Sequence, residues 1–138
     1  MCRKEIIMRV LIAEDDLASR KYILKILEPF GECDFTVNGV ETLDAFLLAL
    51  DELKPYDLIC LDIMMPRADG MKVLKTIRQI EKNNRVEDGQ RVKIIMMTAL
   101  NDTETIEASY NLGCDAFVTK PVDAEKLIKD IRELKLIE

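Results

Sequence analysis

The sequence predicts a single α/β domain built on a doubly wound, five-stranded parallel sheet. Its length of 138 residues suits one compact domain with a single core. Short apolar segments alternate with helical patterns along the whole chain, which is typical of strands connected by helices. With 49% hydrophobic and 33% charged residues, the composition is that of a globular domain rather than a disordered chain.

The first half of the chain reads as strand, helix, strand, helix. Residues 6–13 form an apolar strand, and Asp16 can cap the helix that follows it. Residues 33–37 alternate apolar and polar side chains as a second strand, and Asn38 with Glu41 forms a capping box for the second helix. The residues expected on the buried faces are Leu17, Leu24 and Leu27 in the first helix and Val40, Leu43, Leu47 and Leu50 in the second.

The second half continues the alternation. Residues 58–62, 92–97 and 116–119 read as strands, Asn101 can cap the fourth helix, and Asp123 precedes the fifth. The residues expected to face inward are Val73, Leu74, Ile77 and Ile80 in the third helix and Leu127, Ile128, Ile131 and Leu134 in the fifth.

The strand patterns also predict the strand order. Strands buried on both faces are continuously apolar, as the first, third and fourth are, whereas residues 33–37 alternate and residues 116–119 are short. The last two therefore belong at the edges, and right-handed crossovers make the order 2-1-3-4-5 reachable. We expect one domain over residues 1–138, with residues 1–5 as a lead-in and no output domain.

Charge and hydropathy exclude several classes of protein. A net charge of −6 argues against direct nucleic-acid binding, because a phosphate backbone requires a basic surface. No apolar segment is long enough to cross a bilayer and no signal-peptide pattern opens the chain, so we expect a cytoplasmic protein with no membrane partner.

The absence of histidine limits the chemistry further. Without histidine the chain has no Ser-His or Cys-His nucleophile, and its four dispersed cysteines make a zinc site improbable. Cys60 lies inside an apolar segment and reads as a core residue. Any histidine that takes part in the mechanism must come from another protein.

Three strands end in charged residues that suit phosphoryl transfer. Glu14 and Asp15 follow the first strand, Asp62 ends the third, and Lys120 follows the fifth. The carboxyl ends of parallel strands share one edge of the sheet, where open α/β sheets bind ligands. Carboxylates that share such a cleft can hold Mg2+, which offsets the repulsion between an aspartate nucleophile and a phosphoryl group, while a lysine can bind a phosphoryl oxygen.

Two further groups can complete this site. The backbone carbonyl of Met64 can ligate the metal, and the Thr98 hydroxyl, at the end of the fourth strand, can bind a second phosphoryl oxygen. Taken singly, each feature also fits a structural role, since an acidic residue can cap a helix or form a turn and Thr98 can cap a helix. The conjunction of all of them at the same strand ends favours the functional interpretation.

At these residues the chain resembles the receiver domain of two-component response regulators, like the single-domain chemotaxis regulator. The matching segments are residues 10–15, residues 61–66 with Asp69 and Gly70, residues 97–99 and residues 117–121. They span the chain in the family's order. The resemblance implies a flavodoxin-like (βα)5 fold.

The resemblance also implies roles for individual residues. Asp62 accepts a phosphoryl group from a sensor histidine kinase or a histidine phosphotransfer protein, and Glu14 and Asp15 bind Mg2+ beside it. Thr98 moves toward the phosphoryl group and Phe117 swings inward. In the family the Lys120-Pro121 peptide bond is cis.

The switch implied by the resemblance acts through another protein. Its output surface comprises the fourth helix, fifth strand and fifth helix, which bind a downstream protein target. We expect a monomer or weak dimer that is not an enzyme, since it catalyses only its own phosphorylation and dephosphorylation.

Two positions bear on how long the phosphoryl group lasts. In such regulators the residues two beyond the phosphorylated aspartate and two beyond the switch threonine help to position the hydrolytic water. Here these are Met64 and Leu100, whose side chains cannot hold a water by hydrogen bonding. We therefore predict slow self-dephosphorylation.

Two alternatives remain open. The chain can be the receiver part of a larger regulator with a DNA-binding or enzymatic output domain. It can also be a small aspartate-dependent phosphatase or a flavin-binding module on a similar sheet. The segment from Asp62 to Met64 lacks the second aspartate expected of such phosphatases, and no glycine-rich nucleotide loop is present.

Overall fold

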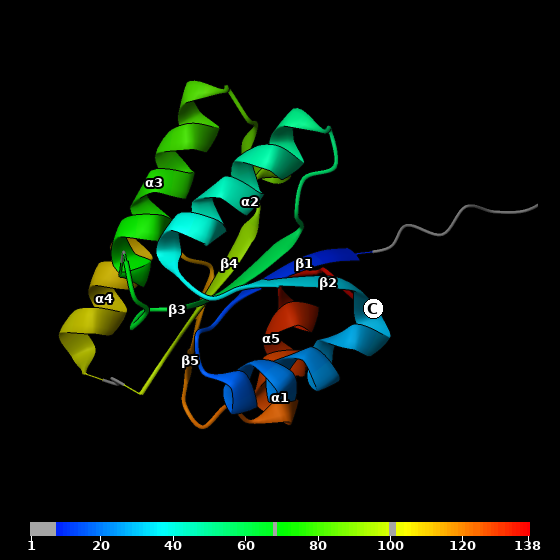
Figure 1. Cartoon of the computed structure of the whole chain (residues 1–138), viewed down its shortest axis with the longest axis vertical. Helices are drawn as coiled ribbons and strands as arrows, with labels where there is room; N and C mark the ends of the chain where they lie inside the picture. The colour runs from blue at the N-terminus through cyan, green and yellow to red at the C-terminus, as the bar shows by residue number, and fades with distance from the viewer. Residues whose placement is uncertain (1–7, 68, 100–101) are drawn as a thin grey trace, which may run out of the picture.

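The computed structural model describes residues 8–67, 69–99 and 102–138. Within these residues, five parallel strands form one sheet in the order β2-β1-β3-β4-β5, which confirms the predicted order (Figure 1). The strands are β1 (Met8–Ala13), β2 (Gly31–Thr36), β3 (Leu58–Asp62), β4 (Lys93–Thr98) and β5 (Ala116–Thr119).

Helices cover both faces of the sheet, as a doubly wound fold requires. Figure 1 shows α1 and α5 on one side of the sheet and α2, α3 and α4 on the other. The helices are α1 (Leu17–Leu27), α2 (Gly39–Asp51), α3 (Gly70–Asn83), α4 (Thr103–Asn111) and α5 (Ala124–Glu133). None of the helices in the described part of the chain is long and apolar enough to cross a membrane.

The sheet separates two apolar cores. Leu11 of β1 packs into the core beneath α2 and α3, whereas its neighbour Ile12 packs into the core beneath α1 and α5. Successive strand residues point to opposite faces, so an inner strand must be apolar at every position. Accordingly β3 is buried throughout, while three of the six residues of the edge strand β2 are exposed.

Each helix begins at a side chain that accepts a hydrogen bond from its first turn. These caps are Asp16, Asn38, Asp69, Asp102 and Asp123. The prediction of Asn101 as the cap of α4 is wrong, because Asp102 accepts from the Thr105 N–H and fills that role. Asn101 itself lies outside the described residues.

The predicted buried face of α2 is rotated from the observed one. Phe46 and Ala49 are buried, whereas Val40 and Leu47, which were expected inside, are 46% and 41% exposed. The many leucines of α2 favoured the wrong face in the prediction, because one position on the face that is actually buried is the polar residue Thr42. Similarly, Leu17 in α1 is exposed rather than buried.

Strand β2 begins two residues earlier than the predicted range of 33–37. Gly31 pairs with Met8, and a Cβ atom at Gly31 would lie only 2.1 Å from the Met8 carbonyl oxygen. The glycine therefore permits close contact between the two strands, in addition to ending the preceding helical segment.

Candidate functional site

Lys120 lies between two carboxylates at the carboxyl edge of the sheet. Its Nζ atom is 2.9 Å from Asp62 Oδ2 and also forms an ion pair with Glu14. Glu14 and Asp62 are buried, whereas Lys120 is partly exposed. The strand ends of β1, β3 and β5 thus converge as the sequence predicted.

Asp15 completes an acidic cluster with the two buried carboxylates. One carboxylate oxygen from each of Glu14, Asp15 and Asp62 lies within 4.8 Å of the others. Asp15 is exposed, so the cluster opens to water on its side. Three oxygen donors with access to solvent suit Mg2+, which keeps several water ligands.

Glu14 carries the clearest sign that this cluster is incomplete without a cation. Among the described residues, its Oε2 atom is buried and has no hydrogen-bond partner. Burial raises the pKa of Glu14 to about 7, with a further contribution from the hydrogen bond to Asp62, while Lys120 acts in the opposite direction. A lone lysine therefore does not compensate the carboxylates fully.

Lys120 remains a cation despite its partial burial. Burial lowers the pKa of Lys120, but its hydrogen bonds to Glu14 and Asp62, together with their charges, raise it above the ordinary value overall. A protonated lysine is a mobile donor that can move from the carboxylates to an oxygen of a bound phosphoryl group.

Close packing of the β3–α3 connection fixes the position of Asp62. The Met64 N–H donates to Asp62 Oδ1 at 3.0 Å, which leaves Oδ2 for Lys120. A Cβ atom at Gly70 would lie 2.4 Å from the Asp62 carbonyl oxygen, so only glycine allows α3 to start this close to the strand. The Met64 side chain is 62% exposed beside the site.

Thr98 ends β4 next to this cluster. It is fully buried, and its carbonyl oxygen accepts a hydrogen bond of 2.8 Å from the Lys120 N–H. The Lys120-Pro121 peptide bond is cis, as the resemblance implied. Leu100, the second predicted dephosphorylation position, lies outside the described residues.

Phe117 lies on the edge strand β5, opposite Met96 of β4. It is partly buried and packs against the core beneath α2 and α3. Together with Ile106 and Tyr110 of α4, it lines a pocket of about 480 Å3. The predicted switch residue thus joins the core to the surface formed by α4, β5 and α5.

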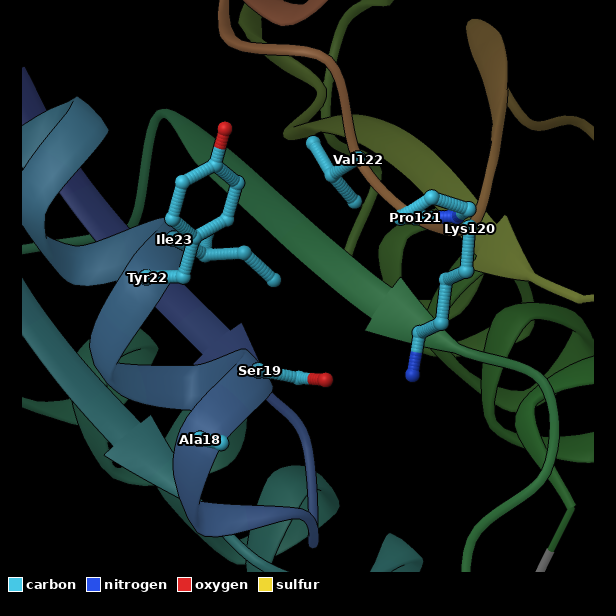
Figure 2. A pocket seen from close by; sticks show the side chains of 7 residues that line it. All are labelled: Ala18, Ser19, Tyr22, Ile23, Lys120, Pro121 and Val122. Carbon is cyan, nitrogen blue, oxygen red and sulfur yellow. The ribbon is translucent and has the colours of Figure 1, made fainter.

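The sequence interpretation missed a second pocket that opens beside Lys120. Ser19 and Tyr22 of α1 face Val122 across a space of about 310 Å3. Figure 2 shows the side chains of Ser19 and Lys120 extending into this space, with the ring of Tyr22 along its wall. No local sequence signal marks it, because it forms only where α1 meets the segment after β5.

The sequence interpretation also missed Arg20. Its guanidinium donates a hydrogen bond of 3.1 Å to the carbonyl oxygen of Glu14. An arginine on a helix is usually a solvent-exposed residue, so its position in the sequence did not distinguish it from its neighbours.

Comparison with known proteins agrees with this geometry. The transcriptional regulatory protein DltR of Streptococcus agalactiae is 34% identical over 126 residues, which are 91% of this chain and 50% of DltR. The chain therefore spans about half the length of that relative.

Solved structures share the fold. A CheY-like receiver domain from Methanospirillum hungatei has a TM-score of 0.77 and 28% identity, over 95% of this chain and 94% of that one. The Saccharomyces cerevisiae Ssk1 receiver domain, solved with the histidine phosphotransfer protein Ypd1, has a TM-score of 0.78 and 26% identity, over 94% and 90%. A family model for the response regulator receiver domain matches residues 10–132, so the chain belongs to this family of two-component signalling domains.

Proposed function

We propose that Asp62 is the phosphoacceptor of this receiver domain. The observation that carries the proposal is the Lys120 Nζ–Asp62 Oδ2 contact of 2.9 Å inside a cluster of three carboxylates. A nucleophile, a cation for the phosphoryl oxygens and a set of oxygen donors for a metal thereby occupy one edge of the sheet.

In the proposed transfer, a carboxylate oxygen of Asp62 attacks phosphorus. The new O–P bond forms as the P–N bond to the donor imidazole breaks, and the imidazole nitrogen keeps the electron pair. The Met64 N–H holds the other carboxylate oxygen, so the nucleophile is oriented before the donor arrives. The donor imidazole belongs to a partner, because this chain contains no histidine.

Glu14, Asp15 and Asp62 are the residues that would hold Mg2+. The buried, unpartnered Oε2 atom of Glu14 and the shared spacing of the three carboxylates support this assignment. When bound, Mg2+ would neutralise charge on the transferring group. The predicted Met64 carbonyl ligand remains part of the proposal.

The phosphohistidine donor is proposed to be a sensor histidine kinase or a histidine phosphotransfer protein. The structural relative Ssk1 was solved with such a phosphotransfer protein, Ypd1. In this chain, Lys120 lines the pocket between Tyr22 and Val122, so a partner seated there would lie next to the lysine that contacts Asp62.

The proposed output is a change in the surface of α4, β5 and α5. Thr98 and Phe117 are the switch residues in this proposal, and the pocket of Phe117, Ile106 and Tyr110 lies on the surface that they would alter. We also propose that the chain catalyses only its own phosphorylation and dephosphorylation and acts on a downstream protein.

We further propose that the protein works in the cytoplasm. Three described cysteines, Cys33, Cys60 and Cys114, are free thiols, which suits a reducing compartment. The half-length match to DltR keeps a longer regulator with an output domain as a second candidate. The full-length transcript separates it from a stand-alone receiver.

Intact-mass spectrometry with acetyl phosphate as donor tests the phosphoacceptor. We expect a Mg2+-dependent mass gain of one phosphoryl group, lost in Asp62→Ala and kept in Asp44→Ala, which removes an exposed carboxylate on α2. Equal labelling of the Asp62 variant would refute the assignment. Continuous turnover of a phosphoester would instead support the phosphatase alternative.

A further inference from the structure

Arg20 is a partly buried residue of α1 whose side chain folds back over the acidic loop, defined as residues 14–16. Its Nη1 atom donates to the carbonyl oxygens of Glu14, at 3.1 Å, and Asp15, at 3.5 Å. Both acceptors are main-chain atoms. The guanidinium therefore hydrogen-bonds to the backbone of two proposed metal ligands and leaves their carboxylate oxygens available.

Phe35 of β2 holds the arginine in this position. The Arg20 guanidinium carbon lies 4.5 Å from the centroid of the Phe35 ring, in cation–π geometry. Phe35 is 52% exposed on an edge strand. An uncovered aromatic ring at such an edge favours association with other chains. Stacking against Arg20 gives this exposed ring a structural purpose.

In the acidic loop, two adjacent side chains must reach the same cluster from different environments, so the position of the backbone between them matters. Glu14 is fully buried and Asp15 is exposed, yet their carboxylates lie within 4.8 Å of each other and of Asp62. The Glu14 N–H donates to the Thr36 carbonyl oxygen at 3.0 Å, which fixes the loop on the β2 side. Arg20 fixes the carbonyl side of the same residues.

We propose that Arg20, stacked on Phe35, is a positioning residue for the Mg2+ site. It sets the backbone of the acidic loop so that the carboxylates of Glu14 and Asp15 converge near Asp62. This inference rests on the proposed Mg2+ site. The partners of metal ligands commonly tune metal affinity in this way.

Considered only as a charge, Arg20 should weaken Mg2+ binding, whereas as a positioning residue it should strengthen it. A guanidinium close to the acidic loop repels a divalent cation, so removing its charge should tighten Mg2+ binding. If Arg20 positions the ligands, its removal should weaken Mg2+ binding in spite of that relief. The sign of the change therefore separates the two roles.

Isothermal titration of the full chain with Mg2+ alone measures this sign. We expect Arg20→Met to raise the Kd for Mg2+ about tenfold, the lower end of the loss seen when an outer partner of a metal ligand is removed. Lys21→Met is the matched control, because it removes the same charge from the next, exposed residue of α1. It should leave the Kd unchanged or lower it.

Phe35→Leu provides a second test that keeps the charge of Arg20. We expect a Kd for Mg2+ about threefold higher, as the loss of one exposed cation–π contact implies. The double variant Arg20→Met/Phe35→Leu should bind no more weakly than Arg20→Met alone, since the ring acts only through the arginine.

Each outcome of these titrations decides the proposal. A Kd for Arg20→Met equal to or below that of the wild type overturns it. If that variant fails to fold, an unchanged Kd in Phe35→Leu overturns it instead. If the wild-type chain binds no Mg2+, the metal site itself is refuted. If the wild type, Arg20→Met and Phe35→Leu all bind Mg2+ with the same Kd, only the role of Arg20 is refuted.

Discussion

Glu14 shows how one buried carboxyl group couples the fold to its ligand. Its raised pKa means that the folded protein binds a proton more tightly than the unfolded chain does. Folding therefore favours the neutral group, whereas a cation favours the charged one. The same residue destabilises the metal-free protein at high pH and is a proposed ligand of the cation.

A pH dependence of stability follows from Glu14. Between its ordinary pKa of 4.5 and the raised pKa of about 7, the native state holds more protons than the unfolded state. The free energy of unfolding without Mg2+ should thus fall as the pH rises through this window, by roughly 3 kcal/mol. Urea unfolding at pH 5 and pH 8 measures the difference.

The control for this dependence is Glu14→Gln, which keeps the shape of the side chain but cannot titrate. We expect a much smaller difference between pH 5 and pH 8 in that variant. Added Mg2+ should reverse the loss in the wild type, because it stabilises the charged carboxylate. A wild-type stability that rises from pH 5 to pH 8 without Mg2+ would contradict the assignment.

The side chains of Met64 and Leu100 lead us to predict a long lifetime for the phosphorylated state. Leucine has no hydrogen-bonding group and the methionine thioether is only a weak acceptor, so neither side chain holds a water firmly. Met64 is exposed beside Asp62. Met64→Asn combined with Leu100→Glu should speed dephosphorylation about tenfold or more, which needs only about 1.4 kcal/mol off the barrier. Loss of label from purified phosphoprotein measures the rate, and loss within seconds in the wild type would disprove slow dephosphorylation.

At the residue scale, the carboxylates and the lysine could be predicted because each lies at the end of a strand or within two residues of it. A parallel sheet brings such positions to one edge whatever the details of packing. Arg20 could not be predicted in the same way. Its contact depends on a side chain reaching back from a helix to carbonyl oxygens, which sequence spacing does not encode.

At the element scale, strand identity was easier to predict than the buried face of a helix. Continuous apolar segments mark buried strands, so the pattern of the strands, together with right-handed crossovers, predicted the order of the sheet. In α2, leucine occurs on several faces, and the buried side is decided by Phe46 and by Thr42, whose hydroxyl bonds to Thr36 and to the Asn38 carbonyl. When a polar residue is buried with hydrogen-bond partners in the core, the positions of the apolar residues alone do not identify the buried face of the helix.

Arg78 joins α3 to both β4 and β5 at the end of the sheet opposite the carboxylates. Its side chain donates to the Gly113 carbonyl at 2.9 Å and to the Val92 carbonyl at 2.8 Å. It also pairs with Glu81 at 2.6 Å and with Asp115 at 2.9 Å. One guanidinium thus satisfies four acceptors from three segments: α3, the residue before β4 and the connection before β5.

Replacing Arg78 should destabilise the domain strongly. Glu81 is only 2% exposed, so Arg78→Met would leave a buried carboxylate without its cation, at a cost of about 3–5 kcal/mol. Urea unfolding measures the loss. Lys75→Met, an exposed position on the same helix, is the control and should change stability by less than about 0.5 kcal/mol. A loss below about 1 kcal/mol in Arg78→Met would show that the network is not structural.

At the scale of the whole molecule, the two ends of the sheet have different properties. The carboxyl end holds the proposed switch, where Thr98 is the last residue of β4 and precedes α4. The opposite end is tied together by Arg78 and by a cluster in which the Tyr56 hydroxyl donates to Asp34 at 2.6 Å and Arg9 stacks over the Tyr56 ring. The fold thus combines a site that can rearrange with an end that resists rearrangement.

This asymmetry predicts where phosphorylation changes the structure. A shift of Thr98 should move the start of α4, while the Arg78 contact to Gly113 holds its end, so the helix should pivot rather than translate. Hydrogen–deuterium exchange after treatment with acetyl phosphate and Mg2+ should therefore change at residues 103–108 and 116–119, and not at residues 111–115. Asp62→Ala under the same conditions should show no change, which separates phosphorylation from binding of Mg2+ or donor elsewhere. An equal change along all of α4 would mean that Arg78 does not anchor the helix, because an anchored end cannot gain exchange when the other end moves.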